Sequence, residues 1–95
     1  MTININKLES ASEMLKAIAH PIRISIVNIL DGDKKLNVTE IFQLLNVEQA
    51  VASHHLSILK NKGVLLSERK GKNCNYYLKH QRLSQIIACI DKCQS

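Results

Sequence analysis

Apolar and polar residues alternate with a helical period over most of the chain. In residues 6–19 and again in 21–30, apolar side chains recur every three or four positions. His20-Pro21 separates the two segments, because the residue before a proline is pushed out of the helical region. Pro21 itself suits the first turn of a helix. The pattern therefore predicts two helices, and Asp31-Gly32-Asp33 ends the second with a glycine suited to a C-terminal cap.

Two more helices are predicted in the middle of the chain. Asn37 and Glu40 have the spacing of a capping box, which places the start of a short helix near Val38. Asn46 can adopt the left-handed conformation that a sharp turn needs. A fourth helix is then predicted over residues 48–61. The side chains expected to face inward from it are Val51, Ala52, Leu56 and Leu59.

After Gly63 the period changes from helical to alternating. Residues 64–70 and 73–78 have the pattern of two strands joined by a hairpin with an exposed basic tip, and helical spacing returns in residues 81–93. The predicted fold class is α+β and mainly helical, in the order ααααββα. A short helix, a tight turn, a second helix and a basic two-stranded hairpin form the layout of a winged helix-turn-helix.

The length of 95 residues fits one domain, residues 1–95, that is small enough for its stability to depend on a partner subunit. The first and last helices carry apolar residues that should not remain in water. We therefore predict a homodimer built on these two terminal helices. The apolar residues concerned are Leu8, Leu15, Ile18, Leu83, Ile86, Ile87 and Ile90.

The charge is positive and unevenly placed. The formal net charge is +5, and between Lys60 and Arg82 seven basic residues face one acid, Glu68. Residues 7–33, by contrast, are nearly balanced. A local excess of this kind predicts a polyanionic partner.

The sequence has no apolar core of a signal peptide and no apolar run of membrane length. We therefore expect a cytoplasmic protein with no membrane partner. In that reducing compartment Cys74, Cys89 and Cys93 are predicted to be thiols, and their odd number argues against a closed disulfide framework.

Three segments resemble one known family, the ArsR/SmtB winged-helix repressors of bacteria. AHPIRISIVNIL (19–30) is similar to the opening of the family's second helix, and VEQAVASHHLSILKNKGVL (47–65) to its recognition helix. ERKGKNCNYYL (68–78) resembles its wing. The resemblance covers nearly the whole chain in the family's order. It implies a homodimer that represses promoters and is often released by a metal ion or another chemical inducer.

One face of the fourth predicted helix is expected to contact DNA. It points away from the apolar face, and its first residues lie at the helix end that usually meets base edges in a major groove. His55 directly follows His54 of this face and is expected to pack or to hydrogen-bond between helices, since adjacent residues on a helix point about 100° apart. The candidate DNA-reading residues are Gln49, Ala50, Ser53, His54 and Ser57.

Basic residues beside this helix are expected to contact the DNA backbone. Lys60 follows the reading face, and Arg69, Lys70 and Lys72 lie on or beside the wing. With two tyrosines and one phenylalanine the chain lacks the stacking platform used on single strands. Double-stranded DNA, with an operator sequence, is therefore the predicted partner.

The sequence lacks the two metal sites that are typical of the family it resembles. Its thiolate-sensing members carry a cysteine-x-cysteine pair where this chain has Asn37 and Thr39, and its zinc-type site needs a histidine that residues 81–95 lack. Cys89 and Cys93 remain, an i, i+4 pair on the last helix. They are either a site for a soft metal ion or a thiol modification, or apolar packing residues. Cys74 is expected to pack.

Two other classes of function stay open. A winged-helix module for protein interaction would not need the basic concentration between Lys60 and Arg82. A thiol- or metal-handling protein would need a cluster of ligands, to which only Cys89 and Cys93 point. No nucleophile or acid stands at a diagnostic spacing from the histidines, so we predict no enzymatic activity. The prediction is a sequence-specific transcriptional regulator, a homodimeric repressor released by an inducer.

Overall fold

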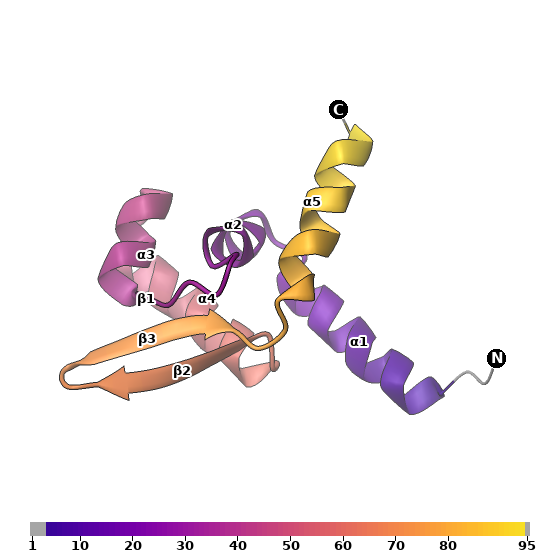
Figure 1. Cartoon of the computed structure of the whole chain (residues 1–95), viewed down its shortest axis with the longest axis horizontal. Helices are drawn as coiled ribbons and strands as arrows, with labels where there is room; N and C mark the ends of the chain where they lie inside the picture. The colour runs from indigo at the N-terminus through magenta and orange to yellow at the C-terminus, as the bar shows by residue number, and fades with distance from the viewer. Residues whose placement is uncertain (1–3, 95) are drawn as a thin grey trace.

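The computed structural model describes the backbone of residues 4–94 and the side chains of that range except at positions 90, 91 and 94. The helices are α1 (Ile5–Ile18), α2 (Pro21–Ile29), α3 (Val38–Leu45), α4 (Gln49–Asn61) and α5 (Arg82–Gln94). The strands are β1 (Leu36–Asn37), β2 (Leu65–Lys70) and β3 (Asn73–Leu78). The β2–β3 hairpin extends from one end of the molecule, and α1 and α5 project at the other (Figure 1). The predicted winged helix-turn-helix is confirmed, with each predicted helix placed to within one residue.

Local hydrogen bonds start the helices where the sequence indicates. The Nδ1 atom of His20 accepts from the backbone N–H of Ile22, with Pro21 at the first helical position of α2. In α3 the capping box is complete: the Asn37 side chain accepts from Glu40 N at 2.8 Å, and the Glu40 carboxylate accepts from Asn37 N at 3.1 Å. These contacts satisfy backbone donors that a helix leaves unpaired at its first turn.

The sheet has three strands where the sequence predicted two. Its order is β1-β3-β2, and both pairs are antiparallel. The added strand β1 pairs Leu36 with Tyr76 and Asn37 with Asn75. A strand of two residues has no visible period, so the sequence predicts Asn37 only as a helix cap. In the structure Asn37 both pairs in β1 and caps α3. The hairpin turns at Gly71, whose positive φ of 61° glycine adopts more readily than other residues.

One apolar core joins the helices to the sheet. Residues from α2, α3 and α4 that are fully buried meet the start of β2 and the end of β3. The largest fully buried side chains are Ile26, Leu30, Ile41, Leu56, Leu59, Leu65, Val27 and Val64. Since α4 contributes two of these leucines, its orientation is set by the core.

Replacing Leu56 by alanine should lower the free energy of unfolding by about 2–5 kcal/mol, because a fully buried leucine leaves a cavity. The matched control is Leu44→Ala on α3, where the side chain is 63% exposed and the change should stay within about 0.5 kcal/mol. Urea unfolding at one fixed protein concentration measures both. Equal losses in the two variants would contradict this core.

Candidate nucleic-acid interface

The candidate interface begins with the sharp turn between α3 and α4. Asn46 adopts the predicted left-handed conformation, with φ 55° and ψ 46°. The next residue, Val47, donates its backbone N–H to the carbonyl of Phe42 at 3.1 Å. The turn therefore packs α4 against α3, as in a helix-turn-helix pair.

The outer face of α4 carries short and polar side chains. Ala50, Ser53, Ser57 and Lys60 follow one another at helical spacing, and His54 lies beside them. Ser53 is half-buried, and the others are exposed. Gln49 is exposed at the first residue of the helix. Small side chains along one exposed helix face let the helix approach another surface closely, which is what entry into a major groove requires.

His55 lies on the inner side of α4, and the prediction that it is a packed, interhelical residue is confirmed. It is 7% exposed, and its Nδ1 atom accepts a hydrogen bond from Nε of Arg23 at 3.0 Å. Arg23, on α2, also donates from Nη1 to the carbonyl of Ala17 in α1 at 3.0 Å. One guanidinium thus connects three helices. Nothing in the sequence singled out Arg23 beyond its place in the HPIR segment.

The two neighbouring imidazoles differ from His55 in exposure and partners. The ring of His20 lies 4.6 Å from that of His55 between centroids, and the ring of exposed His54 lies 5.3 Å away in an edge-on arrangement. Burial, and then the charges of His20, Arg23 and His54, lower the pKa of His55 from its ordinary value of 6.5. The fold therefore favours the neutral form of His55.

The wing presents the predicted basic residues. Arg69, Lys70 and Lys72 are all exposed at its far end, next to the turn at Gly71. Lys60 is exposed on α4. The wing extends away from α1 and α5 (Figure 1), so its charges lie at the end of the molecule opposite the two terminal helices.

Glu68 is placed among the positive charges of the wing. Its carboxylate accepts from Lys35 Nζ at 3.2 Å and lies 3.8 Å from Lys70 Nζ. Lys35 also lies 4.9 Å above the ring centre of Tyr77, whereas Tyr76 packs against the core. Lys35 lies outside the basic segment of the sequence and reaches that segment only through the fold.

The three cysteines are all exposed thiols. The prediction that Cys74 packs is therefore wrong: it pairs with Arg69 across the hairpin, and its side chain is open to water. Cys89 and Cys93 lie one turn apart on α5. Within the described part of the chain, no three histidine, cysteine, aspartate or glutamate side chains gather as metal ligands.

The apolar residues of α1 and α5 divide into two groups. Ile18 and Leu83, predicted to face a partner, are instead buried in this chain's own core, because the two helices converge there. Leu8, Leu15 and Ile86 are about half exposed or more. Ile90 has a side chain outside the described residues.

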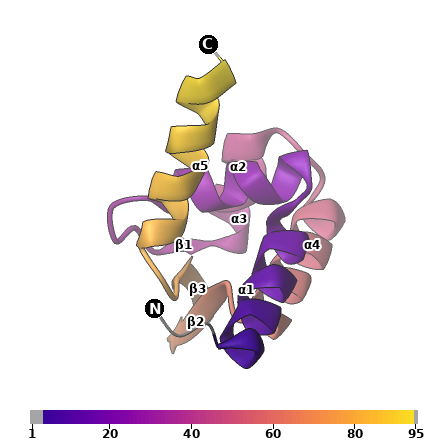
Figure 2. The ribbon, with the colours of Figure 1, turned by 90° about the vertical axis from the view of Figure 1, so that its right-hand side faces the viewer.

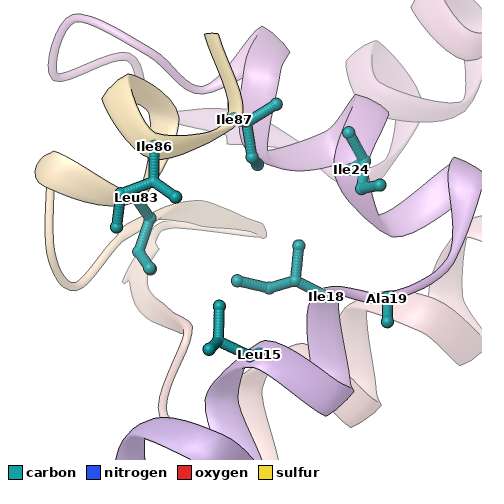
Figure 3. Close-up of a pocket in the computed structure, with 7 residues that line it drawn as sticks. All are labelled: Leu15, Ile18, Ala19, Ile24, Leu83, Ile86 and Ile87. Carbon is teal, nitrogen blue, oxygen red and sulfur yellow. The ribbon is translucent and has the colours of Figure 1, made fainter. Parts of the chain in front are cut away.

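Leu15 and Ile86 border an apolar pocket of about 240 Å³ between α1, α2 and α5. Figure 3 shows the side chains from the three helices around this space. They are Leu15, Ile18, Ala19, Ile24, Leu83, Ile86 and Ile87. Beyond the pocket, α5 rises away from the sheet and from α4 (Figure 2).

No helix in residues 4–94 combines the length and apolar character needed to cross a lipid bilayer.

Comparison with known proteins relates this geometry to a family. The model of the bacterial regulatory protein, arsR family, matches residues 20–67, which run from the N-cap of α2 into β2. The chain is 38% identical over 92 residues to the transcriptional repressor PagR of Bacillus anthracis, covering 97% of this chain and 92% of that protein. It is 40% identical over 80 residues to the transcriptional repressor SmtB of Mycobacterium tuberculosis, covering 84% of this chain and 58% of that one.

Solved structures agree with the sequence comparison. The crystal structure of PagR superposes with a TM-score of 0.82 and covers 92% of this chain and 99% of that one. The matched region contains the α3–α4 pair and the start of the wing, the elements that present the candidate interface. The chain belongs to the arsR family of bacterial regulatory proteins.

Proposed function

We propose that the protein is a repressor that binds a two-fold symmetric operator in double-stranded DNA, with α4 in the major groove and the wing on the backbone. The observation that carries this proposal is the exposed face of α4, with its row of short and polar side chains at Ala50, Ser53, His54 and Ser57. The whole chain then acts as one DNA-binding domain. A DNA partner places the protein in the compartment that holds the chromosome, the cytoplasm.

The residues divide into two roles. Gln49, Ala50, Ser53, His54 and Ser57 lie on α4, where side chains reach base edges and distinguish sequences. Lys60, Arg69, Lys70 and Lys72 are positive and exposed, which suits contacts to phosphates that every sequence offers. The family is one of regulatory proteins, and a protein-interaction module would leave the basic wing without a purpose.

Replacing Ser53 and His54 together by alanine should remove the preference for the operator and leave weak binding to any duplex. Replacing Lys70 and Lys72 by alanine should instead weaken binding to all sequences. It should also flatten the slope of log K against log salt by up to about 0.9 for each phosphate that the variant no longer neutralises. Fluorescence anisotropy with an operator duplex and a random duplex at several salt concentrations measures both effects.

The matched control for charge is Lys7→Ala with Lys92→Ala, which removes one exposed lysine from each of α1 and α5, the two helices that project away from the wing (Figure 1). Because charges separated by more than about 10 Å are screened at 0.1 M salt, this pair should change the slope less than the wing pair does. If the reading-face and wing variants behave alike, the division into base readers and backbone contacts is wrong.

We infer that the apolar pocket and its rim are covered by a second copy of the chain, which forms a homodimer through α1 and α5. Leu15 and Ile86 are exposed and belong to the seven apolar residues that line the pocket, and Leu8 is exposed on α1 about two turns before Leu15, so α1 and α5 carry an exposed apolar surface around the pocket. Such a surface is typical of an interface. A dimer would also present two copies of α4, as a symmetric operator requires.

Replacing Leu15 by aspartate should convert a dimer into a monomer, because the charge would be buried without a partner in the interface. The control is Leu44→Asp, a similarly exposed leucine on α3, which should remain a dimer. Sedimentation velocity at roughly tens of micromolar measures the difference, since an obligate dimer stays assembled there. A wild-type monomer at these concentrations would overturn the interface.

For the release of DNA we propose the thiols of Cys89 and Cys93 as the responding groups. Both are exposed on α5, and this pair is also on the proposed dimer helix. On α5 one chain offers two thiols, whereas zinc in a structural site is held by four ligands, so a zinc site would draw ligands from both copies. Alternatively, exchange with a small-molecule disulfide would join two protein thiols and release two small-molecule thiols.

A variant with Cys89→Ser and Cys93→Ser should fold, dimerise and bind the operator, yet keep its DNA when zinc, copper(I) or a disulfide is added. The wild-type protein should lose DNA affinity by about 5- to 150-fold, the range of a coupling of about 1–3 kcal/mol. Cys74→Ser is the matched control and should respond like wild type. A wild-type protein indifferent to all three reagents, or a responsive double variant, would remove the thiols from the mechanism.

A further inference from the structure

Hydrophobic packing determines which face of α4 points inward. That face also makes one polar contact, between His55 and Arg23, to which the proposed function assigns no role. The Arg23 Nε to His55 Nδ1 hydrogen bond joins residues 32 positions apart in the chain and connects α2 with the inner face of α4 through polar atoms. His55 directly follows His54, a proposed base reader. The position of His55 therefore bears on where His54 points.

The hydrogen bond requires a neutral His55. Because Nδ1 accepts from Arg23, it carries no proton, and the single proton of the neutral ring lies on Nε2. A second proton on Nδ1 would place an N–H donor and a positive charge against the donating guanidinium. The Nδ1 atom of His20 also accepts a hydrogen bond, from the backbone N–H of Ile22.

The surroundings leave a protonated His55 without compensation. The charged and titratable groups that act on it are His20 and Arg23 from the α2 side and His54 from α4, and none of these is an acid. From α1 comes the Ala17 carbonyl, which is already occupied by Arg23 Nη1. A buried charge without a partner is costly, so protonation must break the contact or move the helix.

We propose that His55 is a positioning residue whose hydrogen bond with Arg23 holds α4 in its DNA-reading orientation only while His55 is neutral, so that acid lowers sequence-specific binding. The inference rests on the proposed DNA-binding function and adds a proton as a regulator of it. The His55 contact is distinct from Cys89 and Cys93, which lie on another helix.

The sign follows from the pKa of His55, which the fold lowers from 6.5. At a pH between the lowered pKa and 6.5, His55 binds more protons when its hydrogen bond to Arg23 is broken than when that bond is intact. The stabilisation is therefore complete above pH 6.5 and is lost as the pH falls below it. Across that window, each pH unit can reduce specific binding by up to about tenfold.

The test compares His55→Asn with wild type. Asparagine Oδ1 occupies nearly the place of histidine Nδ1 and can accept from Arg23, but it does not titrate in this range. The probes are a duplex selected from a random-sequence pool by the wild-type protein at pH 8 and an unselected duplex. The measured quantity is the ratio of their dissociation constants from pH 8 to 5.5 at constant salt. This ratio cancels changes in DNA affinity that are common to all duplexes.

The wild-type ratio should fall with acid more steeply than the ratio of His55→Asn, since both proteins keep His54, a proposed base reader. His80→Asn, the same change at an exposed site outside the proposed interface, should follow wild type. A flat wild-type ratio, or a ratio for His55→Asn that falls as steeply as that of wild type, would overturn the proposal.

A second measurement needs neither a variant nor DNA, so it separates this proposal from the proposed function. Imidazole nitrogen NMR of the wild-type protein should show His55 unprotonated at Nδ1 at pH 8. The α4 amide resonances should then shift with the same midpoint as His55, while circular dichroism keeps its helical signal. The proposal would be overturned if the α4 amide resonances did not shift as His55 is protonated, or if the helical circular dichroism signal were lost with the same midpoint. Either result would count even if no duplex binds at any pH.

Discussion

The structure depends first on the burial of one face of α4. Leu56 and Leu59 have no exposed surface. They lie in the same core as Ile26 of α2, Leu30 at the C-cap of α2 and Ile41 of α3. On a helix with 3.6 residues per turn, fixing these positions inward leaves no freedom over which residues face outward. The outward row on α4 is thus a consequence of core packing. A single constraint gives both the stability of the domain and the composition of the surface that we propose faces DNA.

Much of this arrangement follows from the sequence because its causes are local. Helical spacing, the Asn37–Glu40 capping box and the left-handed Asn46 act over three or four residues, and the structure places all of them as predicted. The predictions that were wrong concern contacts between segments that are distant in the sequence. The strand at Leu36 exists only because β3 lies beside it, and Ile18 and Leu83 are buried because α1 and α5 converge. For the same reason, the sequence could predict that His55 packs but could not name its partner, 32 residues away.

The distribution of charge follows from the same fold. The wing carries its lysines at one end of the molecule, and the exposed apolar residues of α1 and α5 lie at the other. Charges on an exposed hairpin remain hydrated and act on a polyanion over about a Debye length. Apolar side chains, by contrast, gain only by leaving water. In the proposed assembly, the separation would let one surface associate with a copy of the chain while the other meets DNA. Glu68 limits the positive charge of the wing through its contacts with Lys35 and Lys70.

Burial and hydrogen bonding make different contributions to the reading surface. The hydrophobic effect is non-directional, so a helix held by apolar contacts alone can turn slightly while keeping most of its buried area. A hydrogen bond weakens steeply when its angle departs from linearity. The buried contact between Arg23 and His55 therefore restricts rotation of α4 in a way that Leu56 cannot, although it adds little net stability. A similar contact joins the Ser84 hydroxyl of α5 to the Asp31 carboxylate after α2. The core thus determines which helices pack together, and directional polar contacts such as these two favour one angle between the helices that they join.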